Sequence, residues 1–395
     1  MNTPLQRPLA DSTGLIENDA HALAVATALA QEFSIDAALR DRERQIPYSE
    51  LDAVSRSGIL GISIPLAFGG AEVNNVILAK VIAQIAQADG SLGQILQNHF
   101  HTLEALRVYG SRAQQQRIFA EVLAGALFGV AVDEQGTTNS QICTAVLAPS
   151  GEGYRISGRK FCATCAPYTR QILASAVDAQ GARYMVFISL DALGLSIVDD
   201  GSCFGQRTVG GGSVMFDNVY VTSSDVVPFQ VSLNDPNCVE RHAQFMHAAV
   251  GTGIARAAYE DTLRFVREHA RPWPEAAVDK ARDDPLTIIE IGRLIIRLHA
   301  AEALLERAGA AVDLNRKAVC AENVALASMV VAAAQTLSTE VSLAAGSKLI
   351  ELGGARATLS DYGLDRHWRN ARVHTLYDPA RWGPHQQGQQ KLAPF

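Results

Sequence analysis

Before position 125, apolar residues recur at spacings of three and four along three segments, which places their side chains on one face of a helix. Between the second and third segments, the run Pro65–Gly70 contains a proline and two adjacent glycines, which interrupt helices. We therefore predict an N-terminal helical domain over residues 1–125. The predicted helices cover residues 17–40, 48–58 and 75–109.

From position 126 to about 236 the pattern changes to short alternating or β-branched runs, each bounded by Gly, Asp or Ser. Strands without intervening helices favour an antiparallel barrel or sandwich over a parallel sheet. A Rossmann fold is excluded because no G-x-G-x-x-G opens a helix, and Gly210–Gly212 leads into a strand-like run. The strands predicted for this middle domain cover residues 144–147, 154–157, 172–176, 185–188, 195–198 and 213–221.

After position 237 long helical periodicity returns, with alanines gathered on one side of the helices. Small residues allow helices to approach closely, which suits both a four-helix bundle and a subunit interface. The Ala-rich faces at 300–311 and 324–334 carry more apolar surface than a monomer normally leaves in water, so we expect a homotetramer, a dimer of dimers. The helices predicted for this C-terminal domain, residues 237–395, cover 240–269, 285–312 and 317–352.

Composition narrows the class of protein. Apolar residues make up 48% of the 395 residues and charged residues 19%, a mixture that can bury a large core. The formal net charge of −7 argues against a general nucleic-acid-binding protein, because no basic stripe can displace counterions from phosphates. Residues 1–14 contain no apolar signal segment, and the longest apolar stretch, 324–337, is too short and interrupted to span a bilayer. We expect a cytoplasmic protein.

Six cysteines are spread along the chain, and two of them, Cys162 and Cys165, form a C-x-x-C. A structural zinc site would need a second pair of ligands at similar spacing, which the other cysteines do not supply. A thioredoxin-like site would open a helix, whereas this pair follows the strand-like run 154–161. We expect neither a metal site nor redox chemistry from the C-x-x-C.

Four motifs resemble those of the acyl-CoA dehydrogenase superfamily. They correspond to its first flavin strand, its G-x-K-x-x-x-T strand, the closing strands of its barrel and the turn before its last helices. The resemblance implies an α+β fold in which an N-terminal helical domain, a middle antiparallel β-barrel and a C-terminal four-helix bundle follow one another. The motifs are Phe128–Thr137, Tyr154–Thr164, Phe204–Thr208 with Val214–Val221, and Leu352–Gly354.

The run His367–Trp382 is similar to the C-terminal signature of one branch of this superfamily, the two-component flavin monooxygenases of the dibenzothiophene monooxygenase type. The stretches 271–273 and 283–285 match the same branch. This resemblance implies a flavin, FMN or FAD, a separate flavin reductase as partner, and a small apolar, sulfur-containing or aromatic substrate.

The resemblance also implies which residues bind the flavin. An isoalloxazine ring needs a flat slot with backbone donors and a hydroxyl group, and a flavin phosphate needs a cation or a helix N-terminus. We assign the phosphate to Arg271, and no residue to a metal. The full predicted cofactor site consists of Val132, Glu134, Cys162, Ala163, Thr164, Arg271, Gly353, Gly354 and Arg369.

A monooxygenase must protect activated oxygen from water until the substrate arrives, which calls for a dry pocket with proton-handling groups. Histidine titrates in the useful range. His99 and His374 match the histidines of the branch, whereas His101 points elsewhere on its helix. Tyr377 and Asp378 complete the predicted catalytic residues.

Three departures from the branch pattern leave alternatives open. Val130, Ala163 and Tyr377 stand where the branch has Asn, Ser and His, so the activity could be redirected or lost. An acyl-CoA dehydrogenase would need a carboxylate base near the C-terminus, and Asp378 in Tyr377–Pro379 is the candidate. The hypotheses are a monooxygenase, a dehydrogenase of acyl-CoA thioesters with bound FAD, or a flavin-binding homologue without catalysis.

Overall fold

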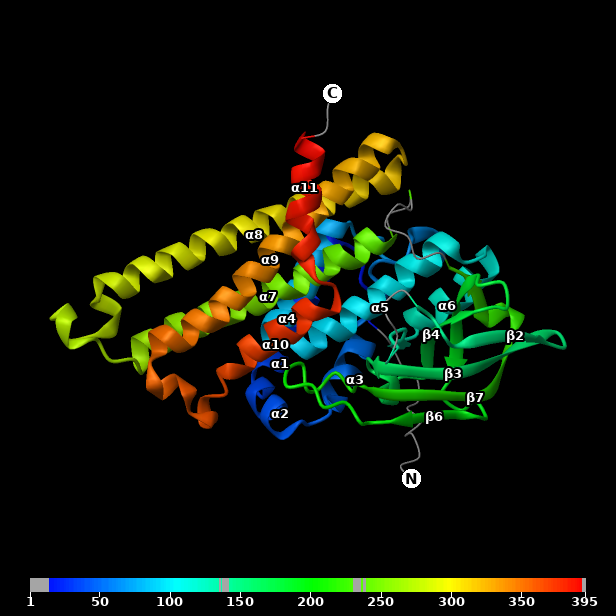
Figure 1. The fold of residues 1–395 in the computed structure, drawn as a ribbon, viewed down its shortest axis with the longest axis horizontal. Coiled ribbons are helices and arrows are strands. Elements are labelled where there is room, and N and C mark those ends of the chain that lie inside the picture. The colour runs from blue at the N-terminus through cyan, green and yellow to red at the C-terminus, as the bar shows by residue number, and fades with distance from the viewer. Residues whose placement is uncertain (1–13, 135, 137–141, 230–235, 237–238, 393–395) are drawn as a thin grey trace.

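The computed structural model of the chain describes residues 14–134, 136, 142–229, 236 and 239–392. Gln135 and Thr137, in the first flavin-strand motif, lie outside the described residues. Element type changes between Leu123 and Phe128 and again between Pro228 and Val239, close to the expected domain boundaries. The strands gather at one end of the molecule, and the longest helices extend away from them (Figure 1).

The N-terminal part is helical, as predicted, but two predicted segments are each divided in two. The segment 75–109 breaks at Asp89, whose carboxylate accepts a hydrogen bond from the Ser91 amide at 2.9 Å and pairs with Arg40 at 3.1 Å. This N-cap begins a new helix within a continuous periodic pattern. The helices are α1 (Asp19–Ser34), α2 (Ala37–Glu43), α3 (Tyr48–Ser57), α4 (Asn75–Ala88), α5 (Gly90–Tyr109) and α6 (Arg112–Leu123).

The middle part is a mixed sheet of strand order β6-β7-β3-β2-β4-β5-β8, with β1 also paired to β4. The expectation of a purely antiparallel sheet is wrong, because β1 and β2 both run parallel to β4. The strands are β1 (Phe128–Ala131), β2 (Val146–Ser150), β3 (Gly153–Ala163), β4 (Gln171–Val177), β5 (Arg183–Ser189), β6 (Leu195–Val198), β7 (Gly212–Thr222) and β8 (Val226–Pro228).

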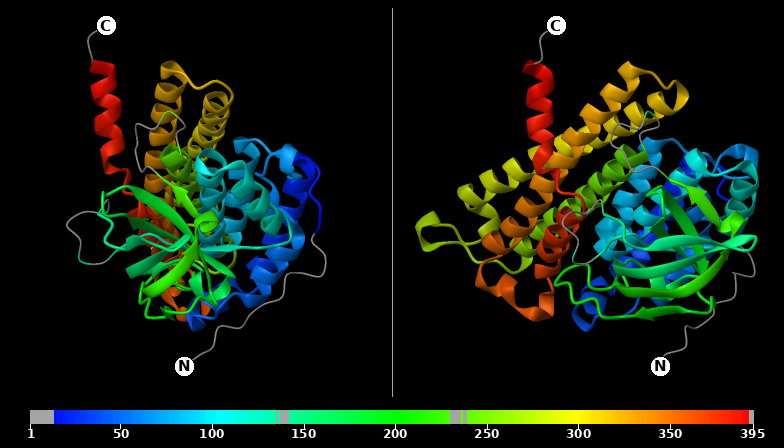
Figure 2. Two further views of the ribbon diagram at one scale, coloured as in Figure 1. Left: turned by 90° about the vertical axis from the view of Figure 1, so that its right-hand side faces the viewer. Right: turned by 45° about the vertical axis from the view of Figure 1, so that its right-hand side comes forward.

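The C-terminal part contains three long helices that pack along one another, with a shorter helix across them and a last helix that projects from the body (Figure 2). Helix α9 is long and apolar enough to pass a test for membrane spans by length and composition, a test that buried core helices also pass. Here α9 packs along α7 and α8. The helices are α7 (Val239–Glu268), α8 (Pro285–Lys317), α9 (Ala321–Gly353), α10 (Asp365–Tyr377) and α11 (Gly383–Leu392).

One cluster of buried apolar side chains joins the N-terminal helices, β1 and the C-terminal helices, with Phe100 of α5, Phe128 of β1 and Phe245 of α7 among its members. Helices α4 and α7 approach closely inside it. A Cβ on Gly253 of α7 would lie 2.3 Å from the carbonyl oxygen of Ala83 in α4, so only glycine permits this contact. The helical regions therefore share a core, while the sheet has a second core of its own.

Candidate active site between the sheet and helix α10

The site is built around an irregularity in β3. The ladder between β3 and β7 shifts register between Lys160 and Ala163, and Cys162 adopts a left-handed backbone conformation with φ of 53°. Beyond this bulge, Thr164 pairs with Val130, through amide-to-carbonyl hydrogen bonds of 2.8 and 2.9 Å. A bulge breaks the strict alternation of side chains, which lets β3 present Cys162 differently from its neighbours.

Tyr377, the last residue of α10, faces this bulge. Burial raises the pKa of the Tyr377 hydroxyl, and the nearby Cys203, Cys162 and Asp133 raise it further. Cys203 belongs to the connection between β6 and β7, and Asp133 follows β1. The structure thus brings together Cys162 and Tyr377, two predicted site residues that are far apart in the sequence.

The connection between β6 and β7 is fixed to α10. The amide of Gln206 donates to Asn370 Oδ1 at 2.6 Å, and Arg369 Nη1 donates to the Phe204 carbonyl at 2.9 Å. A Cβ on Gly205 would lie 2.1 Å from the Arg369 carbonyl oxygen, so glycine is required for this close approach. Gln206 is almost fully buried and has a φ of 48°, a conformation that its anchored neighbours impose.

Arg369, predicted to contact the flavin, already donates hydrogen bonds to three residues. Its guanidinium pairs with Asp41 of α2 and, at 2.7 Å, with Asp365 one turn earlier on α10. Together with its bond to Phe204, these contacts tie α2, α10 and the β6–β7 connection to one another. In this arrangement, Arg369 supports the site from behind.

His374 lies one turn before Tyr377 and is buried. Its Nε2 donates to the His247 carbonyl at 2.9 Å, since a carbonyl can only accept, and Gln206 Nε2 approaches its Nδ1 at 3.5 Å. Burial, reinforced by the neighbouring His247, lowers the pKa of His374 to about 3. At neutral pH the imidazole is therefore uncharged and carries its proton on Nε2.

Two further histidines lie in this region, His247 beside His374 and His101 near His247, and no motif in the sequence marks either of them. The rings of His247 and His374 have their centroids 5.0 Å apart. Burial, with a contribution from His101, lowers the pKa of His247 to about 4. His101 lies two residues after His99 on α5, and residues two apart on a helix do not share a face. The direction in which His101 points, toward His247, could not be read from the sequence.

Several buried polar atoms near His374 have no hydrogen-bond partner within the described residues. They are His101 Nδ1, His247 Nδ1 and Gln206 Oε1. Buried polar atoms are normally satisfied by protein, water or ligand. These atoms therefore fit a site that receives a polar ligand such as a flavin ring or its bound water.

His99 lies in a different environment, inside the core. Its side chain is fully buried, its ring stacks on Phe128 of β1 at 5.7 Å, and its Nε2 donates to the Leu60 carbonyl at 3.1 Å. Burial lowers the pKa of His99 to about 4. Among the described residues, these contacts do not link His99 to His374, so a shared role for the two stays a prediction.

Glu134, another predicted flavin contact, is held in a buried ion pair. Lys160 Nζ lies 2.6 Å from Glu134 Oε1, and the two side chains are 0% and 3% exposed. Burial alone would raise the pKa of Glu134, but hydrogen bonds from Lys160 and Thr144 outweigh it and lower the pKa to about 2. The Val132 carbonyl also accepts from Lys160 Nζ, at 3.3 Å. This pair fixes the segment after β1 beside the bulge.

The remaining predicted cofactor residues lie elsewhere. The connection between α7 and α8, which carries the exposed Arg271, lies at the end of the molecule opposite the strands (Figure 1). Gly353, where a Cβ would lie 3.0 Å from the Phe265 ring, and Gly354 lie near the C-terminal end of α7. In one chain, Arg271 and these two glycines therefore do not meet Cys162.

Asp378 follows α10 directly. Gln335 Nε2 donates to its backbone carbonyl at 2.8 Å, which fixes the main chain at this point. Its half-buried carboxylate makes no hydrogen bond or ion pair with any residue that the structure describes. The predicted role of Asp378 as a base stays a prediction.

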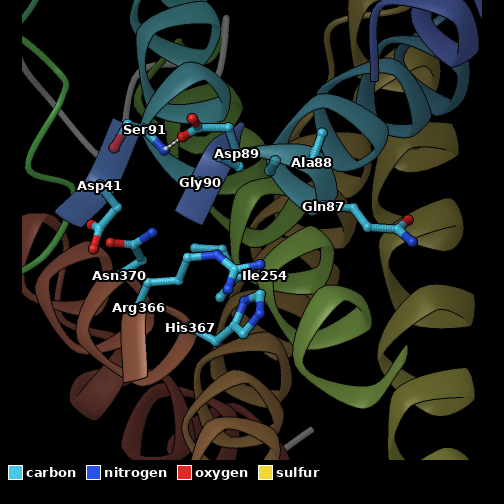
Figure 3. A pocket seen from close by; sticks show the side chains of 12 residues that line it. Asp41, Gln87, Ala88, Asp89, Gly90, Ser91, Ile254, Arg366, His367 and Asn370 are labelled. Atoms are coloured by element: carbon cyan, nitrogen blue, oxygen red, sulfur yellow. Dashed lines mark hydrogen bonds between the residues drawn. The ribbon is translucent and has the colours of Figure 1, made fainter. Parts of the chain in front are cut away.

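Two cavities lie on the side of α10 that faces α4 and α7, away from the β3 bulge. The larger, of about 620 Å³, lies between α1, α4, α7 and α10, and contains the buried pair His367–Asp261 at 2.7 Å. The smaller, of about 10 Å³, is close to the space that one water molecule needs. In Figure 3, Asp89 lies across this smaller cavity from Arg366 and Asn370. Neither cavity is lined by a predicted site residue.

Comparison with known proteins agrees with this architecture. The family models described as acyl-CoA dehydrogenase N-terminal domain and C-terminal domain match residues 17–126 and 245–381. Dibenzothiophene monooxygenase of Mycolicibacterium goodii is 30% identical over 95% of this chain and 94% of its own. The probable FMNH2-dependent monooxygenase SfnC of Pseudomonas putida is 28% identical over 94% of both chains.

Among solved structures, FMN-bound TdsC from Paenibacillus sp. A11-2 superposes with a TM-score of 0.88 at 29% identity, covering 94% of this chain and 97% of its own. The chain belongs to the acyl-CoA dehydrogenase family. Within that family it is a flavin-dependent oxidoreductase. Because these full-length relatives are monooxygenases, it is placed among the flavin-dependent monooxygenases rather than the dehydrogenases.

Proposed function

We propose that this chain is the oxygenase of a two-component system, which receives reduced FMN from a separate reductase and uses O2 to oxygenate a small apolar substrate. The substrate class is an aromatic or sulfur-containing heterocycle. It is suggested by the name of the dibenzothiophene monooxygenases and by the structure of TdsC with FMN and indole. A cytoplasmic location is part of the same proposal.

The observation that carries the proposal is the buried, neutral His374 directly behind Tyr377 at the β3 bulge. Bound reduced flavin would supply the electrons that activate O2. The chain's own part is to exclude water and to handle protons, and the lowered pKa values of His374 and His247 indicate a dry environment on that side. The Tyr377 hydroxyl can donate a hydrogen bond into the slot while staying protonated, because its pKa is raised.

Assembly is the second part of the proposal. Arg271, Gly353 and Gly354 lie far from Cys162 in their own chain, so we propose that they complete the flavin site of a second copy. Helix α8 supports an assembly, because exposed residues recur along it at alternating spacings of three and four, as in a coiled-coil seam. This stripe comprises Leu286, Ile289, Arg293, Ile296, Ala300, Ala303, Arg307, Ala310 and Leu314. We propose a homotetramer, a dimer of dimers.

The test of the oxygenase uses single turnovers. Enzyme with anaerobically reduced FMN is mixed with oxygenated buffer and dibenzothiophene or indole, and product is counted per flavin. His374→Ala should lower product formation by about a hundredfold, the usual contribution of a general acid or base, and leave FMN affinity unchanged. The control is His385→Ala on α11, an exposed histidine outside the site. His99→Gln tests the second predicted histidine in the same way.

Three outcomes would contradict the proposal. If His374→Ala and His99→Gln both formed product as wild type does, the assignment of proton handling to these histidines would be wrong. If an acyl-CoA thioester bleached the bound oxidised flavin anaerobically, and Asp378→Asn abolished that bleaching, the dehydrogenase hypothesis would replace ours. FMN binding without either reaction would indicate the homologue without catalysis.

A further inference from the structure

Two thiols meet at the β3 bulge. Cys162 projects from the bulge, and Cys203 lies in the connection between β6 and β7. This connection reaches the end of β3, because a Cβ on Gly201 would lie 2.3 Å from the Gly211 carbonyl oxygen and the adjacent Gly212 pairs with Ala163. The two thiols interact there. Cys203 is exposed to solvent and Cys162 is half-buried, so the pair lies at the mouth of the candidate site. Forty residues separate the two cysteines, and no spacing motif links them.

The other cysteine of the C-x-x-C is buried in the apolar core, away from solvent. Cys165 is 1% exposed and belongs to the main apolar core, and its backbone amide donates to the Val209 carbonyl at 2.8 Å. Cys162 and Cys165 both have left-handed backbone conformations, so the chain turns between them. The bulge therefore separates the two thiols of the motif and leaves Cys162 facing Cys203.

We propose that Cys162 and Cys203 are a redox-active dithiol that hydrogen peroxide converts reversibly into a disulfide across the mouth of the active site. The Cys203 thiolate attacks one peroxide oxygen, the O–O bond breaks, and water and a sulfenic acid form. The Cys162 thiol then attacks the Cys203 sulfur and displaces the hydroxyl group as a second water. In total, two thiols lose two electrons and two protons, and one peroxide is reduced to two waters.

The pKa values of the two thiols differ in the way that these two reaction steps require. The hydrogen bond from Cys162 lowers the pKa of Cys203 to about 6, and Arg44 lowers it further against the effect of burial. The same hydrogen bond, together with burial, raises the pKa of Cys162. Cys203 is therefore the accessible thiolate that attacks, and Cys162 the protonated thiol that resolves.

The position of the pair gives the disulfide a consequence for the flavin. The β6–β7 connection is held on α10 by the bonds of Gln206 and Phe204, so it has little freedom to follow a new crosslink. A disulfide would draw Cys162 toward it and distort the bulge that forms the slot. We expect FMN to bind at least about tenfold more weakly to the oxidised protein, a penalty of about 1.4 kcal/mol.

This inference rests on the proposed function for its source of peroxide, because an oxygenase that oxidises reduced flavin without substrate releases peroxide beside the pair. The disulfide would then stop flavin binding until a thiol reductant restores it. A substrate-free enzyme would in this way limit its own release of peroxide.

The first test needs no catalysis. The flavin-free protein is treated with equimolar hydrogen peroxide, its free thiols are counted, and its peptides are mapped by mass spectrometry. We expect two thiols to disappear, a crosslinked peptide to join Cys162 and Cys203, and dithiothreitol to restore both the thiols and FMN affinity. Cys203→Ser should abolish the crosslink and make FMN affinity insensitive to peroxide. The control Cys320→Ser removes another exposed cysteine and should change neither result.

Other results would overturn the inference. Irreversible oxidation of Cys203 without a crosslink would show that the two sulfurs cannot join, and equal oxidation of Cys320 would show that the site is not selective. If Cys203→Ser fails to fold, Cys203→Ala provides the same comparison, with the thermal midpoint as a check.

A second experiment separates this inference from the proposed function. A flavin reductase and NADH drive the wild-type protein without substrate, with catalase present in one sample. A crosslink that forms only without catalase supports the dithiol, and the product counted per flavin with substrate present tests the oxygenase separately, because free reduced flavin also yields peroxide with O2. If added peroxide forms the crosslink but no product forms from dibenzothiophene or indole in single turnovers, the dithiol stands and the oxygenase proposal fails.

Discussion

Replacing Lys160 with methionine should destabilise the protein more than any exposed charge change on the same strand. The Lys160 ammonium is fully buried and contacts Glu134 at 2.6 Å, Ser175 Oγ at 2.9 Å and the Val132 carbonyl at 3.3 Å. Methionine fills the volume but leaves the Glu134 carboxylate buried without its cation. Removing one partner of a buried ion pair costs about 3–5 kcal/mol.

The assay is thermal and urea-induced unfolding of flavin-free protein at pH 7.5. The matched control is Arg159→Met, since Arg159 precedes Lys160 on β3 but is 57% exposed and reaches Asp200 only at 3.9 Å. An exposed pair contributes about 0–1 kcal/mol, so this variant should unfold close to wild type. Lys160→Met should unfold about 4–6 °C lower.

The pH dependence identifies the cause. In wild type the pKa of Glu134 is lowered to about 2, so its stabilising contribution is present above the unfolded value and is lost only in strong acid. Without Lys160 that pKa should rise, because burial is then opposed only by the hydrogen bonds from Thr144. Protonation at pH 5 would then relieve the buried charge, and the difference between Lys160→Met and wild type should shrink. A midpoint like that of the control, or a deficit that grows on acidification, would refute this reasoning.

Three further predictions concern other parts of the molecule. Arg271→Ala should weaken FMN binding by about 1–3 kcal/mol in a fluorescence titration, the size of a lost charge-assisted hydrogen bond, and unchanged affinity would place the phosphate elsewhere. Ile296→Glu in the α8 stripe should break the assembly and lower the mass measured by light scattering. A monomeric mass for wild type would contradict the proposed assembly. The buried His242 and His374 have pKa values lowered to about 3, so the unfolding free energy should fall as pH drops below about 6.5, where only the unfolded chain takes up protons; a flat profile would contradict this.

Local patterns predicted which segments are helices and strands, but not the contacts that end them. Asp89 sits within a periodic run and could have been an ordinary helical residue. Its role as a cap depends on Arg40, which lies 49 positions earlier and reaches it only in the folded chain. The parallel pairing of β1 with β4 was missed for a similar reason, because alternation predicts a strand but does not name its neighbour.

Motif similarity indicated which segments meet at the candidate site, but it did not indicate the ion-pair partners of the charged residues there. Cys162 and Tyr377 do come together, and His374 lies directly behind them. Glu134 and Arg369 were assigned to the flavin because they stand in flavin motifs, yet each is engaged by an opposite charge that is distant in sequence. No spacing rule identifies such partners, since ion pairs of this kind depend on the complete fold.

The shared core of the helical regions has a consequence for how the chain is made. Helix α4 emerges from the ribosome about 150 residues before α7, against which it packs through Ala83 and Gly253. At synthesis rates of ~5–20 residues per second, the apolar face of α4 that packs on α7 stays exposed for about 8–30 s before α7 is synthesised. During that interval the nascent chain presents an unfinished core, and the middle sheet is synthesised while it remains open. Ribosome-associated chaperones should therefore engage this chain most strongly between the completion of α4 and the arrival of α7.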